Sequence, residues 1–165
     1  MDTLKGKIAL VTGGNRGIGE AVALALAKVG VDVAINYRAR AEEAEKVCAE
    51  IRKIGRRAVA IQADVSKSPE VTRMVSQIQQ ELGGTNILVN NAGMMRVRKP
   101  EEITETDWDE HINVNLKSAF LVTQLYCPRC GRSAGGGSST FPRWQRRLED
   151  LSGRIMQLLR RVCWA

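Results

Sequence analysis

Apolar residues follow two alternating patterns along the first 124 residues of the chain. Short, nearly continuous apolar runs are typical of strands buried on both faces, and longer stretches with apolar residues at helical spacing are typical of amphipathic helices. The short runs predict strands at residues 8–12, 31–36, 58–62 and 87–90. The longer stretches predict helices at residues 18–29, 41–54, 69–82 and 106–124.

This alternation predicts an α/β fold, because strands joined by helical crossovers form a doubly wound parallel sheet. We expect a Rossmann-type sheet. Gly30 and Gly55 follow the first two helices and are expected to end them. Ser68 is expected to cap the third helix, and Thr106 to open the fourth.

The length of 165 residues is that of one domain. The composition, 44% hydrophobic and 26% charged, is typical of a soluble globular protein. No apolar run approaches the roughly 20 residues of a membrane-spanning helix. The N-terminus has no apolar stretch or cleavage site of a secretory signal, so we expect a cytoplasmic protein without a membrane partner.

The net charge of +7 belongs almost entirely to the last 41 residues. Residues 1–124 carry 17 Lys and Arg against 16 Asp and Glu, whereas residues 125–165 carry 8 against 2. All cations of this tail are arginines, and it holds three of the four cysteines and two of the three tryptophans. The sequence therefore predicts a domain at residues 1–124 and a separate tail at residues 125–165.

Three glycines between the first predicted strand and helix, Gly13, Gly17 and Gly19, have the spacing G-x-x-x-G-x-G. Such a turn lets the backbone approach a pyrophosphate, while the helix N-terminus points free N–H groups at the anion. A tight turn without a ligand is the alternative. The strand before and the helix after favour a dinucleotide site.

Further motifs follow the later strands, and together they cover residues 5–124. They are Thr12-Gly13-x-x-x-Gly17-x-Gly19, Asp64-Val65, Asn90-Asn91-Ala92-Gly93 and Asn113-Val114-Asn115-Leu116. In combination they resemble the short-chain dehydrogenase/reductase family, and within it the 3-oxoacyl-[acyl-carrier-protein] reductase type.

The resemblance implies roles for individual residues. Asp64 and Val65 would contact the adenine, and Asn115 would be the family's catalytic asparagine. The glycine turn would hold the dinucleotide through Gly13, Asn15, Arg16, Gly17, Ile18 and Gly19, and Asn90, Ala92 and Gly93 would pass beside its ribose. Taken singly, the aspartate could instead cap a loop and the asparagine pair could form a turn.

The end of the second predicted strand indicates which dinucleotide is bound. An NAD enzyme places a carboxylate there for the ribose 2′-hydroxyl, but this chain has Asn36, Tyr37 and Arg38. Arg38 and Arg16 would offer two cations to a 2′-phosphate, which predicts NADP(H). Alternatively both are ordinary surface arginines, like others nearby.

The family's chemistry is hydride transfer to a carbonyl, assisted by a serine and a Tyr-x-x-x-Lys pair. A nearby lysine lowers the pKa of the tyrosine, which brings the proton donor closer to the working pH. The last tyrosine is Tyr126, but Cys130 stands where the lysine is expected, and no lysine follows Lys117. Of the catalytic set, Asn115 alone remains.

A shift of reading frame near Gln124 would explain the tail. If each intended codon combined the last base of one codon with the first two of the next, Gln157 after Met156 would encode alanine, and Trp164 after Cys163 leucine. Tail positions that the genetic code nearly fixes in this way agree with the family's missing segment, which carries the serine, tyrosine and lysine. We therefore expect a frameshifted, poorly ordered tail and a chain that is inactive as written.

Two other features of the tail suggest different functions. Cys127 and Cys130 could form half of a zinc site, but only Cys163 and the distant His111 could complete it, so we expect no metal. The arginines could bind nucleic acid, although no element that enters a groove is predicted. We expect no nucleic-acid partner.

The sequence thus predicts an NADPH-dependent reductase of a small or acyl-carrier-bound carbonyl substrate, most simply a 3-oxoacyl thioester. The resemblance also implies that the Rossmann-type sheet is incomplete on its C-terminal side. It implies homo-oligomers as well, although much of the family's interface would be missing. The alternative is a catalytically silent NADPH-binding protein.

Overall fold

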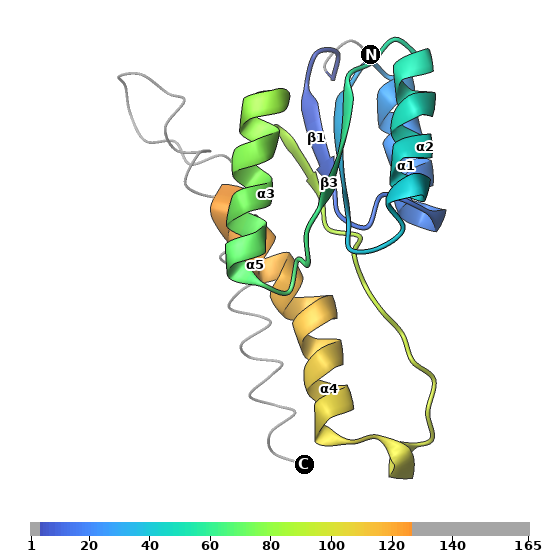
Figure 1. Cartoon of the computed structure of the whole chain (residues 1–165), viewed down its shortest axis with the longest axis vertical. Coiled ribbons are helices and arrows are strands. Elements are labelled where there is room, and N and C mark those ends of the chain that lie inside the picture. Colours follow the sequence, from blue (N-terminus) through green and yellow to red (C-terminus); the bar gives the residue numbers. More distant parts are fainter. Residues whose placement is uncertain (1–3, 127–165) are drawn as a thin grey trace. The chain divides into compact units, whose positions relative to one another are not determined.

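Residues 4–126 are described by the structure, a computed structural model, and form a four-stranded parallel sheet with helices on both faces (Figure 1). The strands, in the spatial order β3-β2-β1-β4, are β1 (Ile8–Val11), β2 (Asp32–Tyr37), β3 (Ala58–Gln62) and β4 (Ile87–Val89). The helices are α1 (Gly17–Lys28), α2 (Ala41–Lys53), α3 (Ser68–Glu81), α4 (Glu105–Ile112) and α5 (Ser118–Tyr126), with a 3-10 turn η1 (Pro100–Glu102) and a π-helical turn η2 (Asn113–Lys117). The predicted α/β fold is confirmed. The expected frameshift and zinc cysteines lie outside the described residues.

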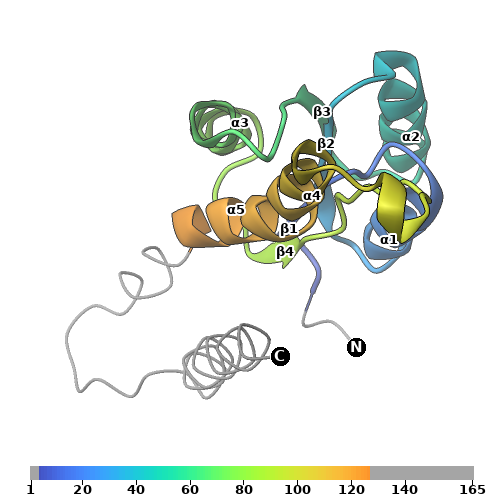
Figure 2. The same cartoon turned by 90° about the horizontal axis from the view of Figure 1, so that it is seen from below.

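Alternate residues of each strand face opposite sides of the sheet and build two cores. On one face, Leu10 of β1 and Ile61 of β3 pack against α3 and against Val122 of α5. On the other face, Val11 of β1 and Ile35 of β2 pack against α1 and α2. Figure 2 shows these two helix pairs on either side of the strands. Each fully buried Leu or Ile contributes about 1.5–3 kcal/mol by leaving water.

All four strands are parallel, so their carboxyl ends meet at one edge of the sheet. The register pairs Val11 of β1 with Ile35 of β2 on one side and with Val89 of β4 on the other. The loops that follow β1, β2 and β4 are therefore held side by side. Ligands of doubly wound sheets bind at this edge.

Residues 105–126 form one helical arm that is interrupted by the π turn η2. Within it, α4 buries Asp107 alone, whereas α5 buries Ser118 and Val122. The apolar side chains of Trp108 and Phe120 are 63% and 61% exposed. The helix predicted at residues 106–124 is therefore a composite of three elements.

The residues predicted to precede or open two helices were wrong by one or two positions. α4 begins after Thr104, whose hydroxyl accepts a hydrogen bond from Asp107 N–H while the Asp107 carboxylate accepts one from Thr104 N–H. This capping box starts the helix at Thr104, whereas Thr106, the predicted opening residue, lies within the first turn. At α3, Ser68 is already helical, Lys67 is the N-cap residue, and no side chain caps the helix.

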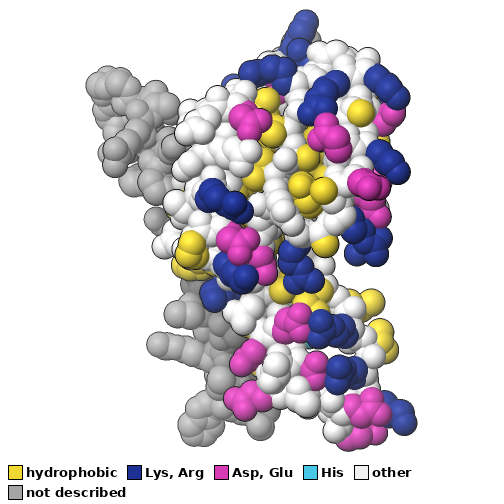
Figure 3. Space-filling view, in the orientation of Figure 1, with side chains coloured by type: hydrophobic (Ala, Val, Ile, Leu, Met, Phe, Trp, Pro, Cys, Tyr) yellow, Lys and Arg dark blue, Asp and Glu magenta, His cyan; other side chains and the backbone are white. Residues whose placement is uncertain are grey.

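Positive and negative side chains are mixed over the face of the described residues shown in Figure 3. Ion pairs such as Arg52–Glu45 and Lys53–Glu50 join exposed groups on α2. Such pairs contribute little to stability. Among the described helices, none is both long and apolar enough to span a membrane.

Candidate functional site

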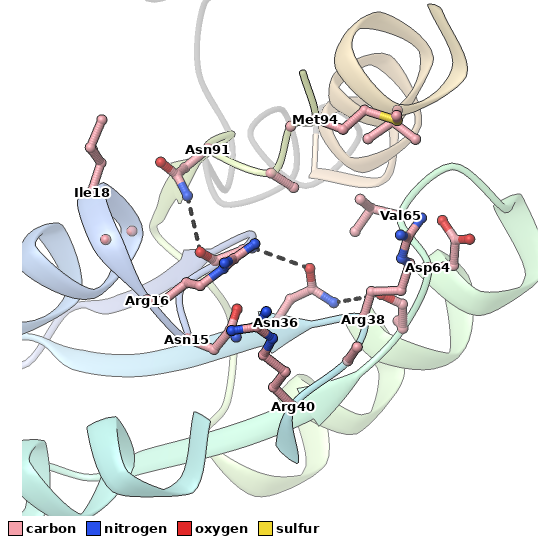
Figure 4. Close-up of a pocket in the computed structure, with 18 residues that line it drawn as sticks. Asn15, Arg16, Ile18, Asn36, Arg38, Arg40, Asp64, Val65, Asn91 and Met94 are labelled. Carbon is pink, nitrogen blue, oxygen red and sulfur yellow. Dashed lines mark hydrogen bonds between the residues drawn. The ribbon is translucent and has the colours of Figure 1, made fainter. Parts of the chain in front are cut away.

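A cleft of about 510 Å³ opens at the carboxyl edge of the sheet, where the loops after β1, β2, β3 and β4 meet (Figure 4). This volume is in the range of small-molecule and cofactor sites. The cleft is lined by Gly13, Asn15, Arg16, Gly17, Ile18, Gly19, Asn36, Arg38, Ala39, Arg40, Ala63, Asp64, Val65, Asn91, Ala92, Gly93, Met94 and Val114. It therefore brings together residues from most of the predicted motifs.

The glycine turn requires two of its glycines for different reasons. A Cβ on Gly19 would lie 2.3 Å from Gly13 O and 2.5 Å from Asn91 Nδ2, so no larger residue fits there. Gly17 has φ +58°, a left-handed conformation that side chains disfavour. Arg16, the residue before α1, makes no side-chain cap, so the first turn of the helix faces the cleft without one.

Thr12 ties the end of β1 to the loop after β4. Its hydroxyl accepts hydrogen bonds from the backbone N–H groups of Asn91 and Ala92, both at 3.0 Å, and donates one to Val89 O. The Asn91 side-chain amide donates in return to Thr12 O and Gly13 O, at 3.0 and 3.1 Å. These bonds fix the wall of the cleft that carries Ala92.

Asn36 and Tyr37, at the end of β2, form hydrogen bonds that hold neighbouring backbone segments together. The buried Asn36 amide donates to Ala63 O at 2.9 Å, and its oxygen accepts from Gly13 N–H at 3.4 Å. Asn36 thus links the glycine turn to the strand ends. Tyr37 does not line the cleft, and its carbonyl accepts from Ala63 N–H.

Asp64, which follows β3, is the one acidic residue among the described residues that line the cleft. Burial raises the pKa of its carboxyl. Hydrogen bonds from the Ser66 hydroxyl and backbone N–H, together with the charges of Lys67 and Arg38, outweigh that effect and leave the pKa below its usual value. Asp64 is therefore an ionised acceptor whose Oδ1 is already held by Ser66, with bonds at 2.6 and 3.0 Å.

Three arginines line the same cleft: Arg16, Arg38 and Arg40. Arg16 belongs to the glycine turn, and the other two belong to the segment between β2 and α2. With Asp64 as the sole acid, the lining has an excess of positive charge. Such a site favours an anionic ligand.

Asn115 lies in the middle of the π turn and faces the loop after β4. Its Oδ1 accepts from Met94 N–H at 2.8 Å, and its Nδ2 donates to Met94 O at 2.9 Å. π turns occur often at functional sites. Asn115 itself does not line the cleft, but its neighbours Val114 and Met94 do.

Two other polar residues of interest lie away from the cleft. The Asn90 side chain turns toward α5 and donates to Thr123 Oγ1 at 3.0 Å. The Tyr126 hydroxyl accepts from Thr85 Oγ1 at 3.3 Å. Thr85 precedes β4, so Tyr126 lies near the amino ends of the strands, opposite the cleft.

The structure adds residues that the sequence analysis did not include in the site, namely Ala39, Arg40, Ala63, Asn91, Met94 and Val114. Asn91 and Val114 belong to the quoted motifs, so those motifs could have indicated them. Within residues 4–126, no group of three or more His, Cys, Asp and Glu side chains could hold a metal ion.

The comparisons with known proteins agree with this arrangement. The family model described as short chain dehydrogenase matches residues 7–138. The hydroxynaphthalene reductase-like protein Arp2 of Metarhizium anisopliae is 45% identical over 122 residues, which cover 74% of this chain and 46% of that protein. The 3-oxoacyl-[acyl-carrier-protein] reductase FabG of Staphylococcus epidermidis is 41% identical over 130 residues, which cover 79% and 53%.

Solved structures give the same result. A short chain dehydrogenase from Burkholderia cenocepacia in complex with NADP matches with a TM-score of 0.73 and 46% identity, covering 76% of this chain and 51% of that one. A putative short-chain alcohol dehydrogenase from Sinorhizobium meliloti matches with a TM-score of 0.75 and 40% identity, covering 82% and 53%. The chain thus spans about half the length of the relatives it matches. From the family match, the fold and the motifs at the cleft, the chain belongs to the short-chain dehydrogenase/reductase family.

Proposed function

We propose that the cleft binds NADP(H), with the pyrophosphate at the glycine turn and the N-terminus of α1. The observation that carries this proposal is the lining itself, which combines the tightly packed glycine turn with three arginines and one acidic residue. The complex of the Burkholderia relative with NADP supports the choice of dinucleotide.

The residues present fit such a ligand. Gly19 leaves no space for a side chain because the first turn of α1 packs directly against Gly13 and Asn91, and the N-terminus of α1, which lines the cleft, would meet the pyrophosphate. Asp64 and Val65 would hold the adenine, and Ala92 and Gly93 would lie beside the ribose. When bound, the cofactor supplies a hydride.

The proposed reaction is the reduction of a carbonyl to a hydroxyl, with a 3-oxoacyl thioester as substrate. The similarity to the reductase of Staphylococcus epidermidis supports this substrate. The similarity to the hydroxynaphthalene reductase-like protein favours an aromatic substrate instead. The two classes differ in shape, so a direct comparison of substrates separates them.

We further propose that residues 1–124 are the dinucleotide-binding domain and that the 165-residue chain is inactive as a reductase. Its tyrosine after β4, Tyr126, is bonded to Thr85 on the side away from the cleft, and no lysine follows Lys117. General-acid catalysis contributes typically about a hundredfold to ten-thousandfold. Asn115 has no partner from the family's Tyr-x-x-x-Lys pair in this sequence. A frameshifted tail at residues 125–165 accounts for that loss.

A second candidate function is that of a catalytically silent NADPH-binding protein. It is favoured by the same observation, a complete dinucleotide cleft beside an incomplete catalytic set. The two candidate functions differ in one respect. For a catalytically silent protein, the nucleotide sequence near Gln124 would contain no shifted reading frame to restore.

The proposal is tested by titrating the chain with NADPH and NADH and by following NADPH oxidation. An acetoacetyl thioester and a hydroxynaphthalene would be compared as substrates for the chain and for a version with the frame restored after Gln124. We expect tighter binding of NADPH, no turnover by the chain, and thioester reduction by the restored version. Tighter binding of NADH would contradict the cofactor assignment, and equal turnover by both versions would contradict the assigned catalytic residues.

A further inference from the structure

The loop that leaves β4 is bound to the helical arm at every second residue of one short stretch. Three contacts join Met94 to Asn115, Arg96 to His111 and Arg98 to Asp107. The partners on the arm are four positions apart and therefore share one face. Four residues of an α-helix rise about 6 Å and two residues of extended chain about 6.6 Å, so the two spacings match. Residues 94–98 thus form a strap along the arm.

The two hydrogen bonds of the His111 ring determine which nitrogen carries the proton. Nδ1 lies 2.7 Å from the carbonyl oxygen of Asp107, which can only accept, so Nδ1 is protonated. Nε2 lies 3.2 Å from the backbone nitrogen of Arg96, whose N–H can only donate, so Nε2 is unprotonated. The middle of the strap is therefore held by the neutral form of the histidine.

Protonation of His111 would remove this acceptor. An imidazolium carries a proton on both nitrogens, so its Nε2–H would face the N–H of Arg96 and no hydrogen bond could form between them. Histidine is the side chain whose charge ordinarily changes between about pH 5 and pH 8. His111 is half-buried, so protons can reach its ring from solvent.

The charged groups around this contact come from both α4 and the strap. They are the carboxylates of Asp107 and Glu110 and the guanidinium groups of Arg96 and Arg98. Arg96 donates to both carboxylate oxygens of Glu110, at 2.5 and 3.1 Å, and Arg98 Nη1 lies 3.3 Å from Asp107 Oδ2. Carboxylates and guanidinium groups ordinarily keep their charge between about pH 5 and pH 8. The charge that changes in this range is therefore that of His111.

The strap begins at the wall of the cleft. Gly93 and Met94 line the cleft, and Arg96 follows two positions later. Met94 is held by the side-chain amide of Asn115, a group that does not titrate. The wall of the cleft therefore has a contact that is independent of pH, and the strap beyond it has one that depends on pH.

We infer that His111 is a pH-dependent latch, which holds the strap on α4 when neutral and releases it beyond Met94 when protonated. The latch is closed above the pH at which His111 titrates and opens as pH falls through it. The ion pairs that remain involve arginines that are 46% and 43% exposed, and exposed pairs contribute little to stability. Acidic pH thus loosens one margin of the cleft. The latch consists of the loop and the helix alone, so it goes beyond the proposed cofactor site.

The test follows the 165-residue chain by NMR as the pH is changed. His111 is the one histidine of the sequence, so its ring signals are unambiguous. At about pH 8 the ring nitrogen shifts should place the proton on Nδ1, and the Arg96 amide shift should titrate with the same midpoint as the ring. Protection of the Arg96 amide, relative to the intrinsic exchange rate at each pH, should fall about fivefold by about pH 5. The Met94 amide is the internal control and should keep its protection.

Two variants separate the hydrogen-bond acceptor from the size of the ring. His111→Gln supplies an amide oxygen as many bonds from Cβ as Nε2 is, and this oxygen accepts at every pH, so the Arg96 amide should stay protected in acid. His111→Phe keeps a ring without an acceptor, so protection should be low throughout. Thermal unfolding near neutral pH confirms that each variant folds.

The parent chain alone can overturn the inference, whether or not the variants fold. An Arg96 amide shift that does not follow the ring titration would do so, as would a ring proton on Nε2 at alkaline pH. Loss of Arg96 protection in acid that persists in His111→Gln would overturn it as well. Binding of NADPH is measured separately at neutral pH, and its absence would overturn the proposed function but leave the latch intact.

Discussion

Asn115 and Met94 exchange two hydrogen bonds, one in each direction, although they lie 21 positions apart in the sequence. The side-chain amide of Asn115 pairs with both the N–H and the C=O of Met94, as the backbone of a neighbouring strand would. In this way the π turn η2 holds the loop that leaves β4 and lines the cleft.

Replacing Asn115 with leucine should release this loop. Both hydrogen bonds would be lost from a largely exposed position, so we expect a decrease of about 1 kcal/mol in the free energy of unfolding. Amide hydrogen exchange at Met94 should accelerate. Asn113→Ala is the control, because the Asn113 side chain makes no hydrogen bond within the described residues. Unchanged exchange at Met94 in Asn115→Leu would contradict the assignment.

Thr12→Val should destabilise the junction of β1 and β4. The valine matches the shape of threonine but leaves the N–H groups of Asn91 and Ala92 without their acceptor at a site that is 2% exposed. An unsatisfied buried donor costs about 1–3 kcal/mol. Urea unfolding should show this loss, whereas Thr12→Ser, which keeps the hydroxyl, should stay close to the parent. Equal stability of the two variants would argue against a role of the hydroxyl.

Gly19→Ala should displace the side chain of Asn91. The new Cβ would overlap Gly13 O and Asn91 Nδ2, at 2.3 and 2.5 Å, and overpacking of this kind costs about 1–3 kcal/mol. The Asn91 side-chain amide resonance should shift in an NMR spectrum. Gly17→Ala meets no atom within 4 Å, so it should strain the backbone but leave that resonance in place. An unmoved resonance in Gly19→Ala would show that the turn has more space than described.

Ser66→Ala should raise the pKa of Asp64. Burial raises this pKa already, and the variant removes the hydroxyl that opposes burial, while the Ser66 N–H still donates. A carboxyl whose folded pKa lies below its unfolded value stabilises the fold above the unfolded pKa, about 3.9, and the stabilisation is lost as pH falls through the folded pKa. The Ser66→Ala variant should therefore lose less stability on acidification. Titration of the Asp64 carboxyl carbon by NMR measures the pKa directly, and an unchanged value would refute the prediction.

The strands were predictable because burial on both faces requires apolar side chains at nearly every position. β1, β2 and β3 lie within one residue of their predicted limits. The start of α4 was not predictable from apolar spacing, because Thr104 fixes it through hydrogen bonds with Asp107. The π turn likewise leaves no mark in the apolar pattern.

The loops that form the site could be predicted from the sequence, but the directions in which their side chains point could not. Gly13, Asp64 and Ala92 meet at the cleft as their motifs implied. The side chain of Asn90, from one of the same motifs, is instead bonded to Thr123. Arg40 resembles any surface arginine in the sequence, because its position depends on its backbone conformation and on a carboxylate that Asn15 shares.

The π turn η2 also sets the rotational phase of the helical arm. Each residue of an α-helix advances the direction of its side chain by about 100°. A π turn holds one residue more than an α-helical turn, so each of its residues advances the side-chain direction by less, and α4 and α5 keep nearly the phase of one continuous helix. Removing a single residue between Asn113 and Lys117 would therefore leave Val122 in the core beside α3, but it would remove the widened turn from which Asn115 reaches the loop after β4.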